Sequence, residues 1–124
     1  MSKDEQARRW SSAKAKRAAA ELCFRHGFYS ESITLSYYAC YQAMWVAVGD
    51  PPAGLWRHGG LMNEFCRALR QQSPSLRKRL DKLYLYRIQG DYEARSLDVA
   101  EAQEGLDIAD EVLRIIAQQV GLAL

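Results

Sequence analysis

Hydrophobic residues recur every three or four positions along most of the chain, which is the spacing of one face of an α-helix. The clearest run lies in the last quarter and comprises Val99, Ala102, Leu106, Ala109, Leu113, Ile116 and Val120. The same spacing predicts further helices over residues 4–26, about 31–48, 61–69 and 73–89. No segment has the alternating pattern of a strand. The sequence therefore predicts an all-α fold with about five helices.

Residues that favour helix starts stand before three of these segments. Ser30 is expected to cap the second helix, because a serine hydroxyl can accept a hydrogen bond from an amide of the first turn. Ser73 followed by Pro74 predicts the start of the fourth helix. Asp98 and Glu101 have the spacing of a capping box, which predicts the start of the fifth helix.

The length of 124 residues predicts a single domain over residues 1–124. No run of about 18 apolar residues is present, so we expect no membrane-spanning helix. The N-terminal segment also lacks the apolar centre of a signal peptide. Cys23, Cys40 and Cys66 are far apart and odd in number, which favours reduced thiols in the cytoplasm over disulfides or a zinc site.

The formal net charge of +2 does not by itself indicate nucleic-acid binding, but the charges are unevenly distributed. The first helix carries a candidate basic face for nucleic acid, made of Arg8, Arg9, Lys14 and Arg17. Its apolar side is expected to include Trp10, Ala15, Ala18 and Leu22. The alternative is that these basic residues form an ordinary solvated helix face.

Arg87 continues the apolar face of the fourth predicted helix, which is formed by Leu76, Leu80 and Leu83. A guanidinium among leucines costs free energy unless it is paired or reaches solvent. Asp91 lies four residues on, within reach if the helix continues past Gly90. One interpretation is a buried structural pair of Arg87 with Asp91. The other is a polar groove, including Tyr92, in which Arg87 meets a phosphate.

Two further residues are candidates for the same groove. His58 precedes two glycines near the start of the third helix, where backbone amides can bind an anion. A capping or surface histidine is the alternative interpretation. Tyr38 belongs to a group of three tyrosines in the second helix, which can equally be core or interface aromatics.

Several common kinds of catalytic and cofactor site are absent from the sequence. It contains no glycine-rich phosphate loop, no metal-ligand spacing of histidine, cysteine and carboxylates, and no GxSxG motif. We therefore expect neither a metal site nor a cofactor. Any acid–base chemistry would depend on His26, His58, the tyrosines or Arg87.

The order of these features resembles the HEPN superfamily, in particular its small stand-alone prokaryotic members. The resemblance covers roughly residues 14–120 and rests on the turn 25–30, the segment 36–42, His58-Gly59, Arg87-x-x-x-Asp91-Tyr92 and the pattern over 100–109. It implies an up-and-down four-helix bundle with an additional helix, usually as a homodimer. It also implies a role in toxin–antitoxin, phage-defence or RNA-processing systems, often with a minimal nucleotidyltransferase as partner.

The sequence departs from the superfamily at one important position. Ribonuclease members carry an arginine, an interval of four to six residues, and then a histidine. Here Tyr92 stands five residues after Arg87, and no histidine follows Arg87 at all. The acid–base member of the usual nuclease pair is therefore missing.

Three functions remain as hypotheses. The first is a dimerising module that binds a nucleotide, RNA or a protein through a groove formed by Arg87, Asp91, Tyr92, His58 and Tyr38. The second is a metal-independent ribonuclease in which Arg87 holds the phosphate while His58 or Tyr92 moves protons. The third is a structural subunit of a nucleoprotein complex that docks through the basic first helix.

Overall fold

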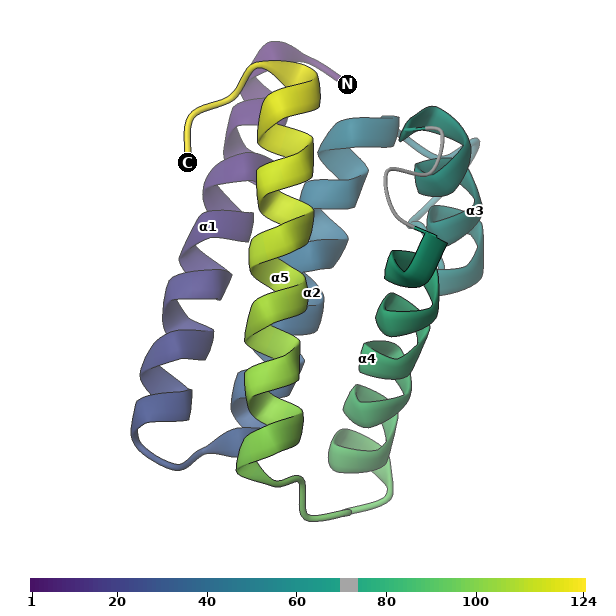
Figure 1. The fold of residues 1–124 in the computed structure, drawn as a ribbon. Coiled ribbons are helices and arrows are strands. Elements are labelled where there is room, and N and C mark those ends of the chain that lie inside the picture. The colour runs from purple at the N-terminus through teal and green to yellow at the C-terminus, as the bar shows by residue number, and fades with distance from the viewer. Residues whose placement is uncertain (70–73) are drawn as a thin grey trace.

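The computed structural model describes residues 1–69 and 74–124, and all of the regular structure in them is helical. The helices are α1 (Lys3–Arg25), α2 (Tyr29–Val48), α3 (His58–Leu69), α4 (Pro74–Tyr92) and α5 (Val99–Val120). Figure 1 shows α1, α2, α4 and α5 side by side and alternating in direction, with the short α3 beside one end of α4. The predicted up-and-down bundle with an additional helix is confirmed.

Helix α2 is the centre of the bundle, because it packs against all four other helices. Its sequence is apolar nearly all round, which is the pattern of a helix contacted on several sides. Ten of its residues are buried, including Ile33, Tyr37, Cys40 and Met44. All three cysteines are free thiols, and Cys40 is the one that is completely buried.

The start of α5 agrees with the sequence pattern. The Asp98 carboxylate accepts a hydrogen bond from the Glu101 amide (2.8 Å), and the Glu101 carboxylate accepts one from the Asp98 amide (3.0 Å). The buried face of the helix is broader than the predicted run, since Ile108 and Val112 are also fully buried. Val99, at the first turn, is 51% exposed.

The predicted N-cap of α2 is wrong. Helix α2 begins at Tyr29 after a Phe28 N-cap that makes no side-chain hydrogen bond, so Ser30 is not the cap. The chain reverses just before this point, at Gly27 with φ of +81°, and the Phe28 amide donates to the Cys23 carbonyl. The expected Ser73 cap of α4 lies outside the described residues.

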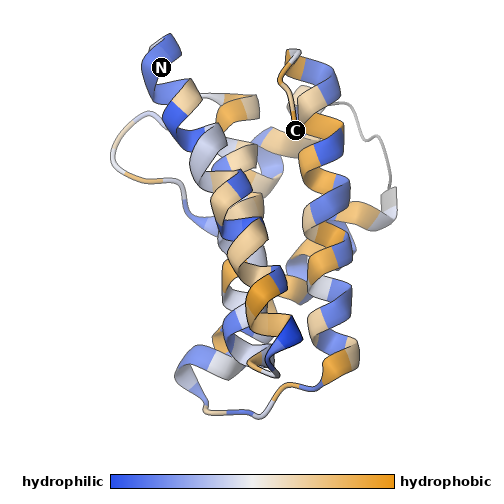
Figure 2. Ribbon diagram, turned by 90° about the vertical axis from the view of Figure 1, so that its left-hand side faces the viewer, coloured by the Kyte–Doolittle hydropathy of each residue, from blue (hydrophilic) through white to orange (hydrophobic). Residues whose placement is uncertain are grey.

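The buried face of α1 also differs from the prediction. Trp10, Ala13 and Ala20 are buried, whereas Leu22 is 58% exposed. An alanine-rich helix can bury any of several faces, because alanines occur on more than one of its sides. Figure 2, seen from the side of α1, shows hydrophobic positions recurring among hydrophilic ones along both α1 and α5.

Candidate functional site

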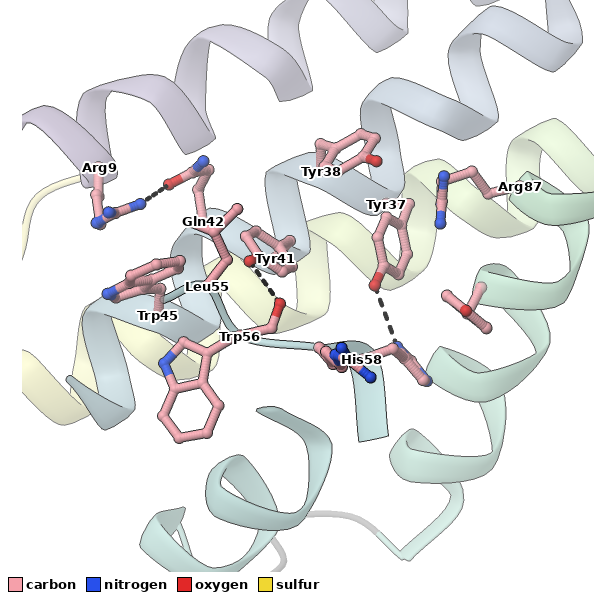
Figure 3. Close-up of a pocket in the computed structure, with 12 residues that line it drawn as sticks. Arg9, Tyr37, Tyr38, Tyr41, Gln42, Trp45, Leu55, Trp56, His58 and Arg87 are labelled. Carbon is pink, nitrogen blue, oxygen red and sulfur yellow. Dashed lines mark hydrogen bonds between the residues drawn. The ribbon is translucent and has the colours of Figure 1, made fainter. Parts of the chain in front are cut away.

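A pocket of about 490 Å³ opens where α1, α2, α4 and the segment leading into α3 meet. Its walls are mostly aromatic, and two arginines lie at opposite ends of the row of α2 side chains (Figure 3). The lining residues are Arg9, Tyr37, Tyr38, Tyr41, Gln42, Trp45, Leu55, Trp56, Arg57, His58, Tyr84 and Arg87. Three of the five residues predicted for a groove, Arg87, His58 and Tyr38, are therefore brought together.

Arg87 is only 8% exposed and lies at one end of this pocket. Its guanidinium carbon is 4.9 Å, 5.2 Å and 5.4 Å from the ring centroids of Tyr37, Tyr38 and Tyr84. Such contacts stabilise a cation away from bulk water. The buried Nε of Arg87 has no hydrogen-bond partner. The guanidinium thus retains one buried donor without a partner.

Asp91 supports Arg87 from the side and is not among the residues that line the pocket. One of its oxygens lies 3.6 Å from an Arg87 terminal nitrogen, and the other accepts a hydrogen bond from the Thr34 hydroxyl (2.7 Å). The i,i+4 geometry exists because α4 continues through Gly90. A Cβ at Gly90 would lie 2.9 Å from Leu97 Cδ1, so this close approach favours glycine.

His58 is held between two polar partners and one aromatic ring. Its Nε2 lies 2.7 Å from Asp81 Oδ1, and its Nδ1 lies 3.2 Å from the Tyr37 hydroxyl. The imidazole stacks on Tyr84 with centroids 4.1 Å apart. Burial raises the pKa of Tyr37, an effect that the nearby Arg87 charge opposes, so the phenol stays protonated at neutral pH. Because a carboxylate only accepts hydrogen bonds, His58 Nε2 is the donor to Asp81, and Nδ1 is left to interact with the Tyr37 hydroxyl.

The segment before α3 is fastened to α2 and forms another wall of the pocket. The Tyr41 hydroxyl donates to the Trp56 carbonyl (2.7 Å), and the Trp56 indole donates to the Gly49 carbonyl (2.8 Å). Burial raises the pKa of Tyr41, and the positive charge of Arg9 partly offsets this. These contacts fix the position of a loop whose prolines and glycines have no helical or strand pattern of their own.

The remaining predicted site residues lie elsewhere. Tyr92 is 74% exposed at the end of α4 and does not line the pocket. The four residues of the expected basic face have different contacts. Arg9 contributes to the pocket, Arg8 is exposed, and the Lys14 ammonium lies 3.5 Å from the Ala123 carbonyl oxygen.

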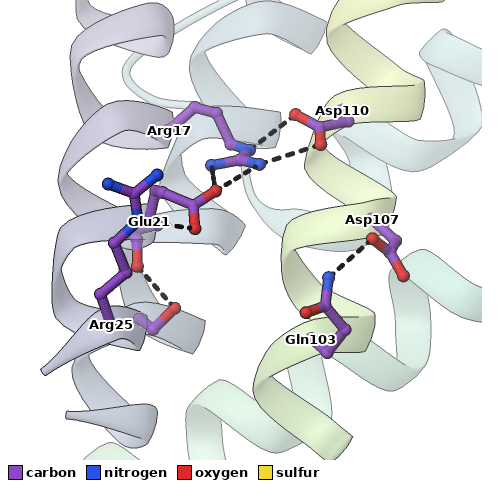
Figure 4. A network of polar contacts seen from close by, with 8 residues as sticks. Arg17, Glu21, Arg25, Gln103, Asp107 and Asp110 are labelled. Carbon is purple, nitrogen blue, oxygen red and sulfur yellow. Dashed lines mark hydrogen bonds and ion pairs between the residues drawn. The ribbon is translucent and has the colours of Figure 1, made fainter. Parts of the chain in front are cut away.

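Arg17, the fourth member of that set, is engaged in a polar network between α1 and α5 (Figure 4). Its Nε and one terminal nitrogen donate to the two Asp110 oxygens at 2.7 Å and 2.9 Å, and it also reaches Glu21. The hydrogen bond to Asp110 raises the pKa of Arg17. This side chain therefore fastens two helices together.

Sequence reasoning did not identify Asp81, Tyr37 or Tyr84 as site residues. A spacing of three residues separates Asp81, Tyr84 and Arg87, which places them on one side of the helix. This spacing is visible in the sequence and could have identified them. Tyr37 was indistinguishable from a core aromatic. The described residues contain no group of three or more histidines, cysteines and carboxylates that could hold a metal ion.

A comparison with protein families matches the HEPN domain over residues 7–120. The chain belongs to the HEPN family. The resemblance found in the sequence is thereby confirmed, and HEPN domains are often involved in RNA-related or toxin–antitoxin functions and commonly dimerise. A comparison with curated proteins gives no match. None of the helices in the described residues is long and apolar enough to cross a membrane.

Proposed function

We propose that this HEPN domain binds a nucleotide or single-stranded RNA in the pocket around Arg87. The observation that carries the proposal is the Arg87 guanidinium, which is buried against tyrosines with one donor unused beside an open pocket. A buried charge without full pairing costs folding free energy, and such costs concentrate at functional sites. Arginine is also well suited to phosphate, because its planar group can donate two parallel hydrogen bonds.

The rest of the pocket supports a nucleotide over a protein segment. Tyr38, Tyr41 and Trp56 offer aromatic surface, and stacking of a base on such a surface contributes about 1–3 kcal/mol. Single-stranded RNA is recognised largely in this way, by aromatic stacking combined with cationic contacts to the backbone. A concave pocket with aromatic walls and cationic ends matches both requirements.

The proposal is tested by the affinity for a short fluorescein-labelled single-stranded RNA, measured by fluorescence anisotropy. Arg87→Gln is expected to weaken binding at least tenfold, because the guanidinium contact to phosphate is lost. Arg8→Gln is the matched control, since Arg8 is an exposed arginine outside the pocket. Equal affinity of the wild type and a folded Arg87→Gln variant would refute the proposal.

The proposed setting is a homodimer in the cytoplasm, within a toxin–antitoxin, defence or RNA-processing system and with a minimal nucleotidyltransferase as a possible partner. Family membership supports the dimer, and three free cysteines are typical of a reducing compartment. Light scattering of the isolated chain tests the dimer. A monomer at tens of micromolar would contradict it.

A second candidate function is metal-independent cleavage of RNA, and the Asp81–His58 hydrogen bond favours it. A carboxylate that orients a histidine is a recurring arrangement for proton transfer. His58 lines the same pocket as Arg87, which would hold the phosphate. The test is an incubation with labelled RNA and a chelator, run beside Arg87→Ala and His58→Ala. Cleavage that both substitutions abolish would establish this function; no cleavage by the wild type would exclude it under those conditions.

A further inference from the structure

The end of the pocket opposite Arg87 contains a second arginine, Arg9, which is partly buried. The Arg9 guanidinium carbon lies 3.5 Å from the centroid of the Trp45 ring, and its NH1 donates to the Gln42 side-chain oxygen at 3.0 Å. The Arg9 Nε is buried and has no hydrogen-bond partner. Glu5 lies 3.8 Å from its other terminal nitrogen, at the edge of ion-pair distance. Arg9 therefore repeats the situation of Arg87, with a guanidinium stacked on aromatic surface and a donor unused.

Further positive charge is present along the same wall. Arg57 lines the pocket, and within the described part of the chain its side chain has no hydrogen-bond or ion-pair partner. Three acidic residues lie near the pocket but outside its lining: Glu5 beside Arg9, Asp81 beside His58 and Asp91 beside Arg87. The pocket surface itself thus presents cationic donors and aromatic rings, with no carboxylate among its lining residues.

The two arginines are too far apart to share one phosphate. Arg87 lies over the Tyr38 ring, and Arg9 lies over the Trp45 ring. Trp45 follows Tyr38 by seven residues in α2. Seven residues of α-helix correspond to a rise of about 10.5 Å. Figure 3 shows Tyr41 between the two arginines, with Trp56 and His58 facing it from the opposite side of the pocket. Aromatic surface therefore fills the interval between the two cationic ends.

We propose that the pocket has two anion subsites, at Arg87 and at Arg9, and that it takes a strand segment with two phosphates joined by a nucleoside. A short ligand of this class is a dinucleotide that carries a 5′-phosphate. Each phosphate meets one guanidinium, and the nucleoside between them lies against the aromatic wall. This inference rests on the proposed function and extends it, because it selects a strand over a mononucleotide.

Calorimetric titration with two probes tests the inference on the wild-type protein. The probes are adenosine 5′-monophosphate and the 5′-phosphorylated dinucleotide of adenosine. The dinucleotide is expected to bind at least tenfold more tightly, since it occupies both subsites. Arg9→Gln is expected to remove that difference, whereas Arg87→Gln weakens both ligands.

The salt dependence gives a second readout that a purely structural role of Arg9 would not change. For single strands the logarithm of affinity falls with the logarithm of salt concentration by about 0.7 for each phosphate neutralised. Arg9→Gln should therefore reduce the slope for the dinucleotide by about 0.7, and the control Arg8→Gln should leave it unchanged. Circular dichroism checks that each variant is folded. Should Arg9→Gln unfold, Arg9→Met replaces it, because methionine also removes the charge and can still pack on the Trp45 ring.

The outcomes separate this inference from the proposed function. Equal affinities for the two probes, with loss of both in Arg87→Gln, would overturn the second subsite and leave the proposed function in place. Failure of the wild type to bind either probe or single-stranded RNA would overturn both. Tighter dinucleotide binding that survives in a folded Arg9→Gln or Arg9→Met variant would place the second phosphate elsewhere and overturn the assignment to Arg9.

Discussion

Replacing Arg87 with methionine distinguishes an arginine that stabilises the fold from one that is kept for a ligand. Methionine has a similar length, is apolar, and fits the space between Tyr37, Tyr38 and Tyr84 with favourable contacts of its sulfur with the rings. If Arg87 serves a ligand, this change should abolish RNA binding and alter the free energy of unfolding by less than about 1 kcal/mol.

That magnitude follows from the contacts of the guanidinium. Its interactions with three rings contribute about 0.5–1 kcal/mol each, and the pair with the partly exposed Asp91 contributes about 0–1 kcal/mol. Against these, a buried Nε–H without a partner costs about 1–3 kcal/mol. Methionine removes that cost and adds its own contacts with the rings. The favourable and unfavourable contributions therefore nearly cancel.

The assay is urea unfolding at neutral pH, followed by circular dichroism and tryptophan fluorescence. Leu83→Ala is the matched control one turn earlier in α4, because Leu83 is fully buried and its truncation should cost about 2–5 kcal/mol. A loss of about 3 kcal/mol or more in Arg87→Met would refute the reasoning. Such a loss would identify the Arg87–Asp91 pair as a structural element that the fold requires.

Three other predictions concern the stability of the fold. Gly90→Ala should destabilise the protein by about 1–3 kcal/mol in the same urea assay, because the new methyl group meets Leu97, whereas an unobstructed helical site would gain stability. Asp98→Ala should cost about 0.5–2 kcal/mol through loss of the α5 cap, and an unchanged midpoint would contradict the capping role. Burial raises the pKa of Tyr37 in the folded state, so the unfolded state loses its proton first and stability falls as pH rises above about 10. Tyr37→Phe should make this decline in the free energy of unfolding shallower between pH 10 and 12. The slope should change by at most about 1.4 kcal/mol per pH unit.

The helices could be predicted from the sequence because their signals are local. The spacing of apolar residues over 99–120 and the Asp98–Glu101 pair act within a turn or two, and the structure contains both. The buried face of α1 could not be predicted in the same way. Its many alanines give almost no directional signal, and packing of Trp10 and Ala13 against neighbouring elements decides which side is buried.

The pocket was predictable only in part, because its residues come from distant segments. The position of Arg87 on an apolar helix face indicated an unusual arginine, and the structure places it beside the pocket. Arg9 was grouped with other basic residues of the first helix, since charge alone does not show which of them stacks on Trp45. Asp81 and His58 are 23 residues apart, and their hydrogen bond depends on how α3 and α4 pack.

The arrangement around Arg87 favours binding over cleavage for a physical reason. A general base must have a free lone pair within reach of the proton that it removes. Both nitrogens of His58 are occupied, one by Asp81 and the other by the Tyr37 hydroxyl. Accepting a ligand proton at Nδ1 would require the Tyr37 hydroxyl to release its bond, and the phenol is too weak an acid to leave as an anion. The guanidinium groups of Arg87 and Arg9, by contrast, line the pocket with permanent positive charge and need no proton transfer to attract a phosphate.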